Sequence, residues 1–191
     1  MTYLLKSQIK NTLGQRIMKI RYALILVLAT LIMGCATPAN RQAMTVSKFE
    51  GNVIVNPNLK AKFYVRNVSG GKDTNPLWTS QVATEDFKGA LDQSLDAVGY
   101  KAERSETATY FIDAELKELD QPLVGLTFDV HSNVFYVVDG KGDKKSIPIT
   151  ATGKATVNDA FIAIERLKIA NEKSIRENIK AFINSLSQSI Q

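Results

Sequence analysis

The sequence predicts an α+β protein, in which a mostly antiparallel sheet of about four to five strands carries two helices packed on one face, preceded by a signal peptide and a tether. Three observations support this prediction. An apolar run ends directly before Cys35, the single cysteine. Apolar and polar residues alternate through the middle of the chain, which is typical of strands. Apolar residues at helical spacing lie on both sides of that region.

Residues 1–34 have the order of a secretory signal peptide. Basic residues precede an apolar run over residues 22–34, and Gly34 is a small residue at the expected cut. A membrane-spanning helix needs about 20 apolar residues, and this run is shorter. Met18 is an alternative first residue of the translated protein, because a signal peptide that begins there has ordinary proportions.

The four residues Ile32-Met33-Gly34-Cys35 resemble the lipobox of bacterial lipoproteins. The resemblance implies cleavage between Gly34 and Cys35 and acylation of the Cys35 thiol, so that acyl chains hold the protein to a membrane. Met33 departs from the family pattern, which prefers a smaller residue there. The residue after the cysteine is Ala36 and not Asp. In enteric-type sorting, this resembles the sequence of lipoproteins that are sent to the outer membrane.

Removal of residues 1–34 changes the charge of the chain. The 24 Lys and Arg residues include five in that segment, which contains no acid, so 19 basic residues remain against 19 acidic ones. Nucleic-acid binding needs a basic surface, and the mature chain is formally neutral. We therefore expect no nucleic-acid partner.

The segment from 35 to 46 is expected to be a lipidated tether, because it has no periodicity and contains Pro38. The folded periplasmic domain is then expected to span residues 47–191. Short strands are predicted over 52–56 and 62–66.

Residues 67–83 form a long connection that holds Leu77 and Trp78. These two side chains either fold back onto the core or form a contact site for a partner or for lipid.

A helix is predicted to begin after Thr84, which is expected to cap it, and to run to about Val98, where Gly99 ends it. Strands follow over 108–118 and 124–138, and residues 139–143 form a hairpin turn into a return strand. Pro148 predicts that this last strand lies at an edge or carries a bulge.

The closing helix is predicted over 159–187, with Asn158 as its cap and a bend or break near residues 168–171. Its first part carries more apolar residues than one core stripe needs. Phe161, Ile162 and Ile169 are therefore candidate contacts for a partner.

Catalytic and metal-binding patterns are absent from the sequence. His131 is the single histidine, and Ser132 beside it points to the opposite face of the expected strand. No metal-spaced Cys/His set and no phosphate-binding loop occurs. We expect a protein that is not an enzyme and has no cofactor or metal.

Further motifs lie at Asn75–Ser80, Phe87-x3-Leu91-x3-Leu95, Tyr110–Asp113 and Glu165-Arg166-x3-Ala170. With these motifs, most of residues 47–187 resembles small Gram-negative outer-membrane lipoproteins of unassigned function, including YajG-like proteins and auxiliary lipoproteins of ABC-type transport systems. The resemblance implies a periplasmic α+β domain on a lipid anchor and no catalytic residue.

Together these observations predict a lipid-anchored accessory protein that faces the periplasm and binds another envelope protein. The alternative is a binder or carrier of a small or lipidic ligand in an envelope transport system. That alternative needs an apolar cavity, which Phe87, Leu91, Tyr110 and Phe128 would line.

Overall fold

The computed structural model describes residues 18, 21, 36–75 and 79–189. The chain divides into two compact units, Met1–Cys35 and Ala36–Gln191, and the fold below is that of the second. Within the described residues, no helix has the length and apolar character needed to cross a membrane.

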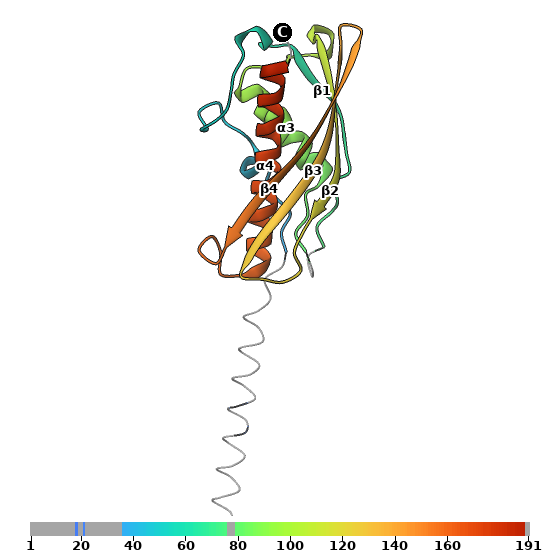
Figure 1. Cartoon of the computed structure of the whole chain (residues 1–191). Helices are drawn as coiled ribbons and strands as arrows, with labels where there is room; N and C mark the ends of the chain where they lie inside the picture. Colours follow the sequence, from blue (N-terminus) through green and yellow to red (C-terminus); the bar gives the residue numbers. More distant parts are fainter. Residues whose placement is uncertain (1–17, 19–20, 22–35, 76–78, 190–191) are drawn as a thin grey trace, which may run out of the picture. The chain divides into compact units, whose positions relative to one another are not determined.

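A four-stranded sheet forms the body of the domain (Figure 1). Its order is β1-β2-β3-β4, with β1 at Phe63–Ser69, β2 at Tyr110–Asp120, β3 at Thr127–Gly140 and β4 at Asp143–Thr156. The pairs β2–β3 and β3–β4 are antiparallel, whereas β1 pairs parallel to β2. This arrangement confirms the predicted α+β class, and β4 is an edge strand, as Pro148 indicated.

Two long helices cover one face of the sheet (Figure 1). Helix α3 spans Thr84–Ala97 and connects the parallel strands β1 and β2. It begins with Glu85 and Asp86 in its first turn, where acidic side chains favour the helix dipole. Gly99 follows its end with a φ of 79°, a conformation that glycine adopts without strain.

Helix α4 spans Ala163–Ser189 continuously, so no break occurs near residues 168–171. The prediction assumed that a long helix would outrun the sheet. However, β3 and β4 have 14 residues each and extend for about 45 Å. They therefore support a 27-residue helix of about 40 Å along its length. The helix also begins at Ala163, and residues 159–162 precede it.

The predicted strand over residues 52–56 is also wrong. Asn52 has a positive φ of 72°, and the segment forms polar contacts with the end of α4 in place of a strand ladder. The amide group of Asn184 accepts from the Ile54 backbone N–H at 2.8 Å and donates to the Asn52 carbonyl at 2.8 Å. Side chains of α4 thus satisfy the backbone that a neighbouring strand would otherwise pair.

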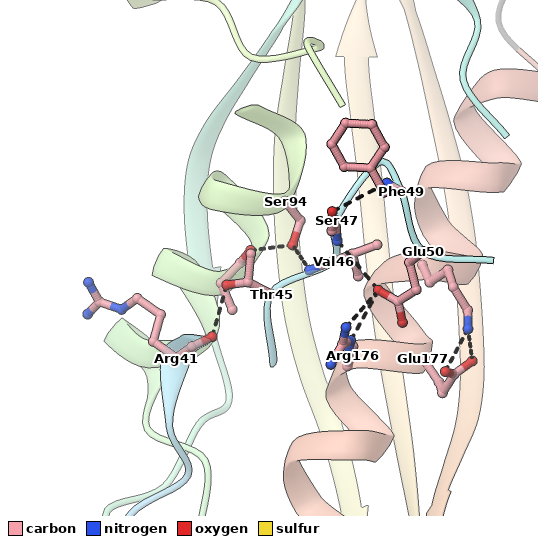
Figure 2. A network of polar contacts seen from close by, with 11 residues as sticks. Arg41, Thr45, Val46, Ser47, Phe49, Glu50, Ser94, Arg176 and Glu177 are labelled. Atoms are coloured by element: carbon pink, nitrogen blue, oxygen red, sulfur yellow. Dashed lines mark hydrogen bonds and ion pairs between the residues drawn. The ribbon is translucent and has the colours of Figure 1, made fainter. Parts of the chain in front are cut away.

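Residues 36–46 pack against the domain, which differs from the expected tether. Helix α2 spans Arg41–Met44, and the side chains of Met44 and Val46 are fully buried in the main core. The Val46 N–H donates to the Ser94 hydroxyl at 2.8 Å, and Glu50 accepts from Arg176 at 3.0 Å (Figure 2). The folded unit therefore starts at about residue 36.

The core has two parts. The main cluster lies between the sheet and both helices and contains the ring stack of Tyr136 on Phe182, with centroids 3.9 Å apart. A smaller cluster contains Phe128, Val130, Ala155, Leu167 and Ala170, near the start of α4. The smaller cluster borders the connection between β2 and β3 and the connection between β4 and α4.

Candidate functional site

Six exposed apolar side chains lie in two connections of the sheet. Three belong to the connection between β2 and β3, and three lie between the end of β4 and the start of α4. We call these six the apolar loop patch: Leu123, Val124, Leu126, Val157, Phe161 and Ile162. Leu123 and Phe161 are 97% and 92% exposed, which leaves large apolar side chains fully in water. Clustered exposed apolar groups of this kind mark interaction surfaces.

The two connections meet at one end of the domain. Thr127, the first residue of β3, pairs with Thr156, the last residue of β4. The chain leading into Thr127 and the chain leaving Thr156 therefore run side by side. Figure 1 shows both connections at the same end of the sheet, opposite the hairpin between β3 and β4.

Arg166 fastens the two connections to each other. Its side chain is buried, at 4% exposure, and it donates to the carbonyls of Ala160 at 2.9 Å, Phe161 at 2.6 Å and Gly125 at 3.1 Å. The guanidinium also lies over the Phe128 ring, 5.4 Å from its centroid. One side chain of α4 thereby holds both loops in place from beneath.

The described chain begins at the same end. The Thr37 carbonyl accepts from the Ser80 hydroxyl at 2.8 Å, and the Ser80 carbonyl accepts from the Gln121 amide at 2.9 Å. Gln121 directly follows β2 and opens the connection that holds Leu123. The buried Asn171 amide donates to the same Ser80 carbonyl at 3.0 Å and completes this clamp.

A buried carboxyl group also holds the N-terminal segment. Glu172 is 7% exposed and accepts from the Asn40 backbone N–H at 2.7 Å. Burial raises the pKa of the Glu172 carboxyl above its ordinary value, and the hydrogen bond from Asn40 only partly opposes this shift.

Among the described residues, no helix covers the face of the sheet opposite α3 and α4, and this face carries a charged cluster. Arg66 on β1 forms an ion pair with Asp113 on β2, and its Nη2 lies 3.3 Å from Asp139 at the end of β3. The hydrogen bond from Arg66 is the main cause that lowers the pKa of Asp113. Half-buried aromatic side chains lie on the same face beside the cluster: Tyr64, Phe111 and Phe135.

The predicted contact residues differ in their surroundings. Phe161 and Ile162 are exposed, at 92% and 56%, and lie just before α4 begins. Ile169 is half-buried and packs against the smaller core cluster. Leu77, Trp78, Gly34 and Cys35 lie outside the described residues.

Sequence reasoning missed Leu123, Val124, Leu126 and Arg166. Val124 and Leu126 were expected on the inner face of a strand, but β3 begins only at Thr127. Pro122 precedes these positions and Gly125 lies between them, and both residue types interrupt strands. That signal was sufficient to predict a loop.

His131 is exposed, and its Nδ1 lies 2.8 Å from the Thr152 hydroxyl. Ser132 lies on the opposite, buried face, as the alternation predicted. Among the described residues, no three His, Cys, Asp or Glu side chains gather as a metal-binding group.

The cavity required by the ligand-carrier alternative is not formed by the predicted residues. Phe87, Leu91 and Tyr110 belong to the main core cluster, whereas Phe128 belongs to the smaller one. A surface hollow of about 210 Å³ borders Tyr110 at the edge of the hairpin, with Gly140, Lys141 and Ser189. That hollow is open to solvent and does not include the other three residues.

Comparison with known proteins assigns no family. No family model matches the chain, and no curated protein sequence matches it. Among solved structures, the chain is similar to a DUF330 protein from Xanthomonas campestris, with 12% identity, a TM-score of 0.47, and coverage of 69% of this chain and 88% of that one.

Two other solved structures are similar to the chain. A hypothetical protein from Chlamydia trachomatis has 9% identity and a TM-score of 0.47, over 68% of this chain and 99% of that chain. A minor lipoprotein from Acinetobacter baumannii has 14% identity and a TM-score of 0.38, over 63% of this chain and 90% of its own.

Proposed function

We propose that this chain is a lipid-anchored, non-catalytic accessory protein of the bacterial envelope. In this proposal Cys35 becomes the first residue of the mature protein and carries the acyl chains. The destination is the outer membrane, because Ala36 and not Asp follows the cysteine, and the domain faces the periplasm. The protein acts by binding another envelope protein.

One structural observation supports the proposal more than any other. Thr37 and Asn40, which follow Cys35, are held by Ser80 and Glu172, at the end of the domain that carries the apolar loop patch. A lipid at Cys35 would therefore fix which end of the domain lies at the membrane. The uncovered face of the sheet would remain accessible at the side.

Permanent attachment needs more than one acyl chain. Each buried CH₂ contributes about 0.8 kcal/mol, and a single acyl chain gives only reversible membrane binding. The lipobox resemblance implies two or three chains on Cys35, which is sufficient for a resident membrane protein.

The uncovered sheet face is the surface that we assign to the protein partner. It combines Arg66 with the half-buried rings of Tyr64 and Phe111, and aromatic and Arg side chains dominate the energetics of many interfaces. The helices cover the other face, so a partner has access to one side of the sheet.

The anchor is tested by palmitate labelling of cells that express the full chain. Cys35→Ser is expected to abolish both labelling and cleavage, while a conservative change elsewhere, Ser189→Ala, leaves both intact. Labelling of the Cys35→Ser protein would contradict the assignment.

The partner surface is tested by a photo-crosslinking amino acid placed at Phe111, with Asp96 on α3 as the control position. The expected result is a discrete protein adduct from position 111 and none from position 96. Equal adducts at the two positions would refute the assigned face.

A further inference from the structure

We infer that the apolar loop patch contacts the lipid bilayer directly, as a second membrane contact beside the acyl anchor. The inference rests on the proposed anchor at Cys35. It adds a named surface of the folded domain and a defined orientation of that domain on the membrane.

The first argument is the position of the attachment point. Thr37 is held by Ser80, and Ser80 is held by Gln121, which opens the connection that contains Leu123. Two residues of chain span at most about 7 Å, so an acyl group attached two residues before Thr37 is joined to the domain close to this clamp. Acyl chains on Cys35 therefore bring the end of the domain that carries the patch to the bilayer surface.

The second argument is that the two loops carry little charge. Residues 121–126 read Gln-Pro-Leu-Val-Gly-Leu and residues 157–162 read Val-Asn-Asp-Ala-Phe-Ile, so the single charged side chain is Asp159, which pairs with Lys173 at 2.7 Å. Because neither loop contains Lys or Arg, attraction to anionic lipid is not the expected source of binding. Apolar side chains that reach the boundary of headgroups and acyl chains suit a zwitterionic surface as well.

The third argument is that the loops are held ready for contact. Arg166 donates to carbonyls in both connections, and Phe128 packs against it from the smaller core cluster. The loop backbone therefore needs little ordering when the patch enters the interface, which keeps the entropic cost of contact low.

A protein partner and a second copy of this chain are the competing occupants of the patch. The membrane is favoured over both because the covalent anchor leads to this end of the domain. The uncovered sheet face has no such connection to Cys35.

The experiment replaces Phe161 with the photo-crosslinker benzoylphenylalanine in the full chain, reconstituted into phosphatidylcholine vesicles. Phe49 is the matched control, because it is also an exposed phenylalanine, at 86%, and lies elsewhere on the domain: its neighbour Glu50 accepts from Arg176, near the middle of α4 (Figure 2). Both changes keep an aromatic ring at an exposed site, so neither is expected to disturb folding.

Irradiation is expected to give phospholipid adducts several times more often at position 161 than at position 49, as read by intact mass. Equal or absent lipid adducts at the two positions would overturn the inference. A crosslinked dimer formed through position 161, or a protein adduct in place of lipid in intact cells, would also overturn it.

The design separates failure of the inference from failure of the anchor. If the intact mass shows no acyl chains on Cys35, a maleimide lipid is coupled to the Cys35 thiol. This thiol is the single one in the chain, so the lipid attaches there. The same comparison of positions 161 and 49 then tests the patch at the same attachment point, while the missing acyl mass alone refutes the anchor.

Discussion

Nη2 of Arg166 donates to the carbonyl oxygen of Gly125 at 3.1 Å and joins two loops that are distant in the sequence. The same guanidinium reaches Ala160 and Phe161 through Nη1. No carboxylate pairs with Arg166 among the described residues, so backbone carbonyls are its hydrogen-bond acceptors. This arrangement makes the shape of the apolar loop patch depend on one side chain.

Arg166→Leu is expected to lower the free energy of unfolding by about 2–3 kcal/mol, because three hydrogen bonds from a charged donor are lost. Arg176→Leu is the control on the same helix. Its ion pair with Glu50 is partly exposed and is worth about 1 kcal/mol or less. Urea denaturation measures both variants, and equal losses would refute the bridging role of Arg166.

Gly153→Ala is expected to destabilise the packing of α4 on β4. A Cβ at position 153 would overlap the Ala170 carbonyl oxygen and the Ser174 backbone nitrogen. Overpacking costs about 1–3 kcal/mol, and backbone atoms cannot turn aside as a flexible side chain can. Gly51→Ala, where no atom lies within 4 Å, should leave the unfolding midpoint unchanged. A neutral Gly153→Ala would show that helix and strand are farther apart than described.

Met44→Ala tests whether residues 36–46 belong to the folded domain. Met44 is completely buried, and truncation of a buried Met costs about 2–5 kcal/mol. Phe49→Ala removes an exposed ring and should change stability by less than about 0.5 kcal/mol. Thermal unfolding of the two variants distinguishes a packed segment from a free tether, for which both would be neutral.

Glu172→Gln tests the buried carboxyl beside Asn40. Because burial raises the pKa of Glu172, the folded state binds more protons than the unfolded state between the ordinary and the raised pKa. Stability should therefore fall as pH rises through that window.

Glutamine keeps an acceptor for the Asn40 N–H and does not ionise, so this part of the pH dependence should disappear. Asp159 titrates outside the window, since its hydrogen bond to Lys173 lowers its pKa to about 2. Thermal midpoints of both proteins across mildly acidic to neutral pH measure the effect, and parallel curves would contradict it.

The sequence was sufficient for the elements whose periodicity is local. Alternation predicted β2, β3 and β4, and Pro148 placed β4 at the edge of the sheet. The stripe from Phe87 to Leu95 predicted α3, since each of these side chains faces the core. These features depend on residues that are close together in the sequence, and the structure confirms them.

Features that depend on distant partners were not predictable in this way. The segment 52–56 has the composition of a strand, but Asn184 and Ser187 on α4 satisfy its backbone. Met44 and Val46 resembled part of a tether because their burial is created by α3 and α4. The role of Arg166 likewise arises only when the chain brings Gly125 and Phe161 together.

The central claim is that Cys35 carries the protein on the membrane, and intact mass of the detergent-extracted protein from a bacterial host tests it most directly. The account predicts a mass equal to residues 35–191 plus acyl chains. An unmodified mass, or one that retains residues 1–34, would contradict it.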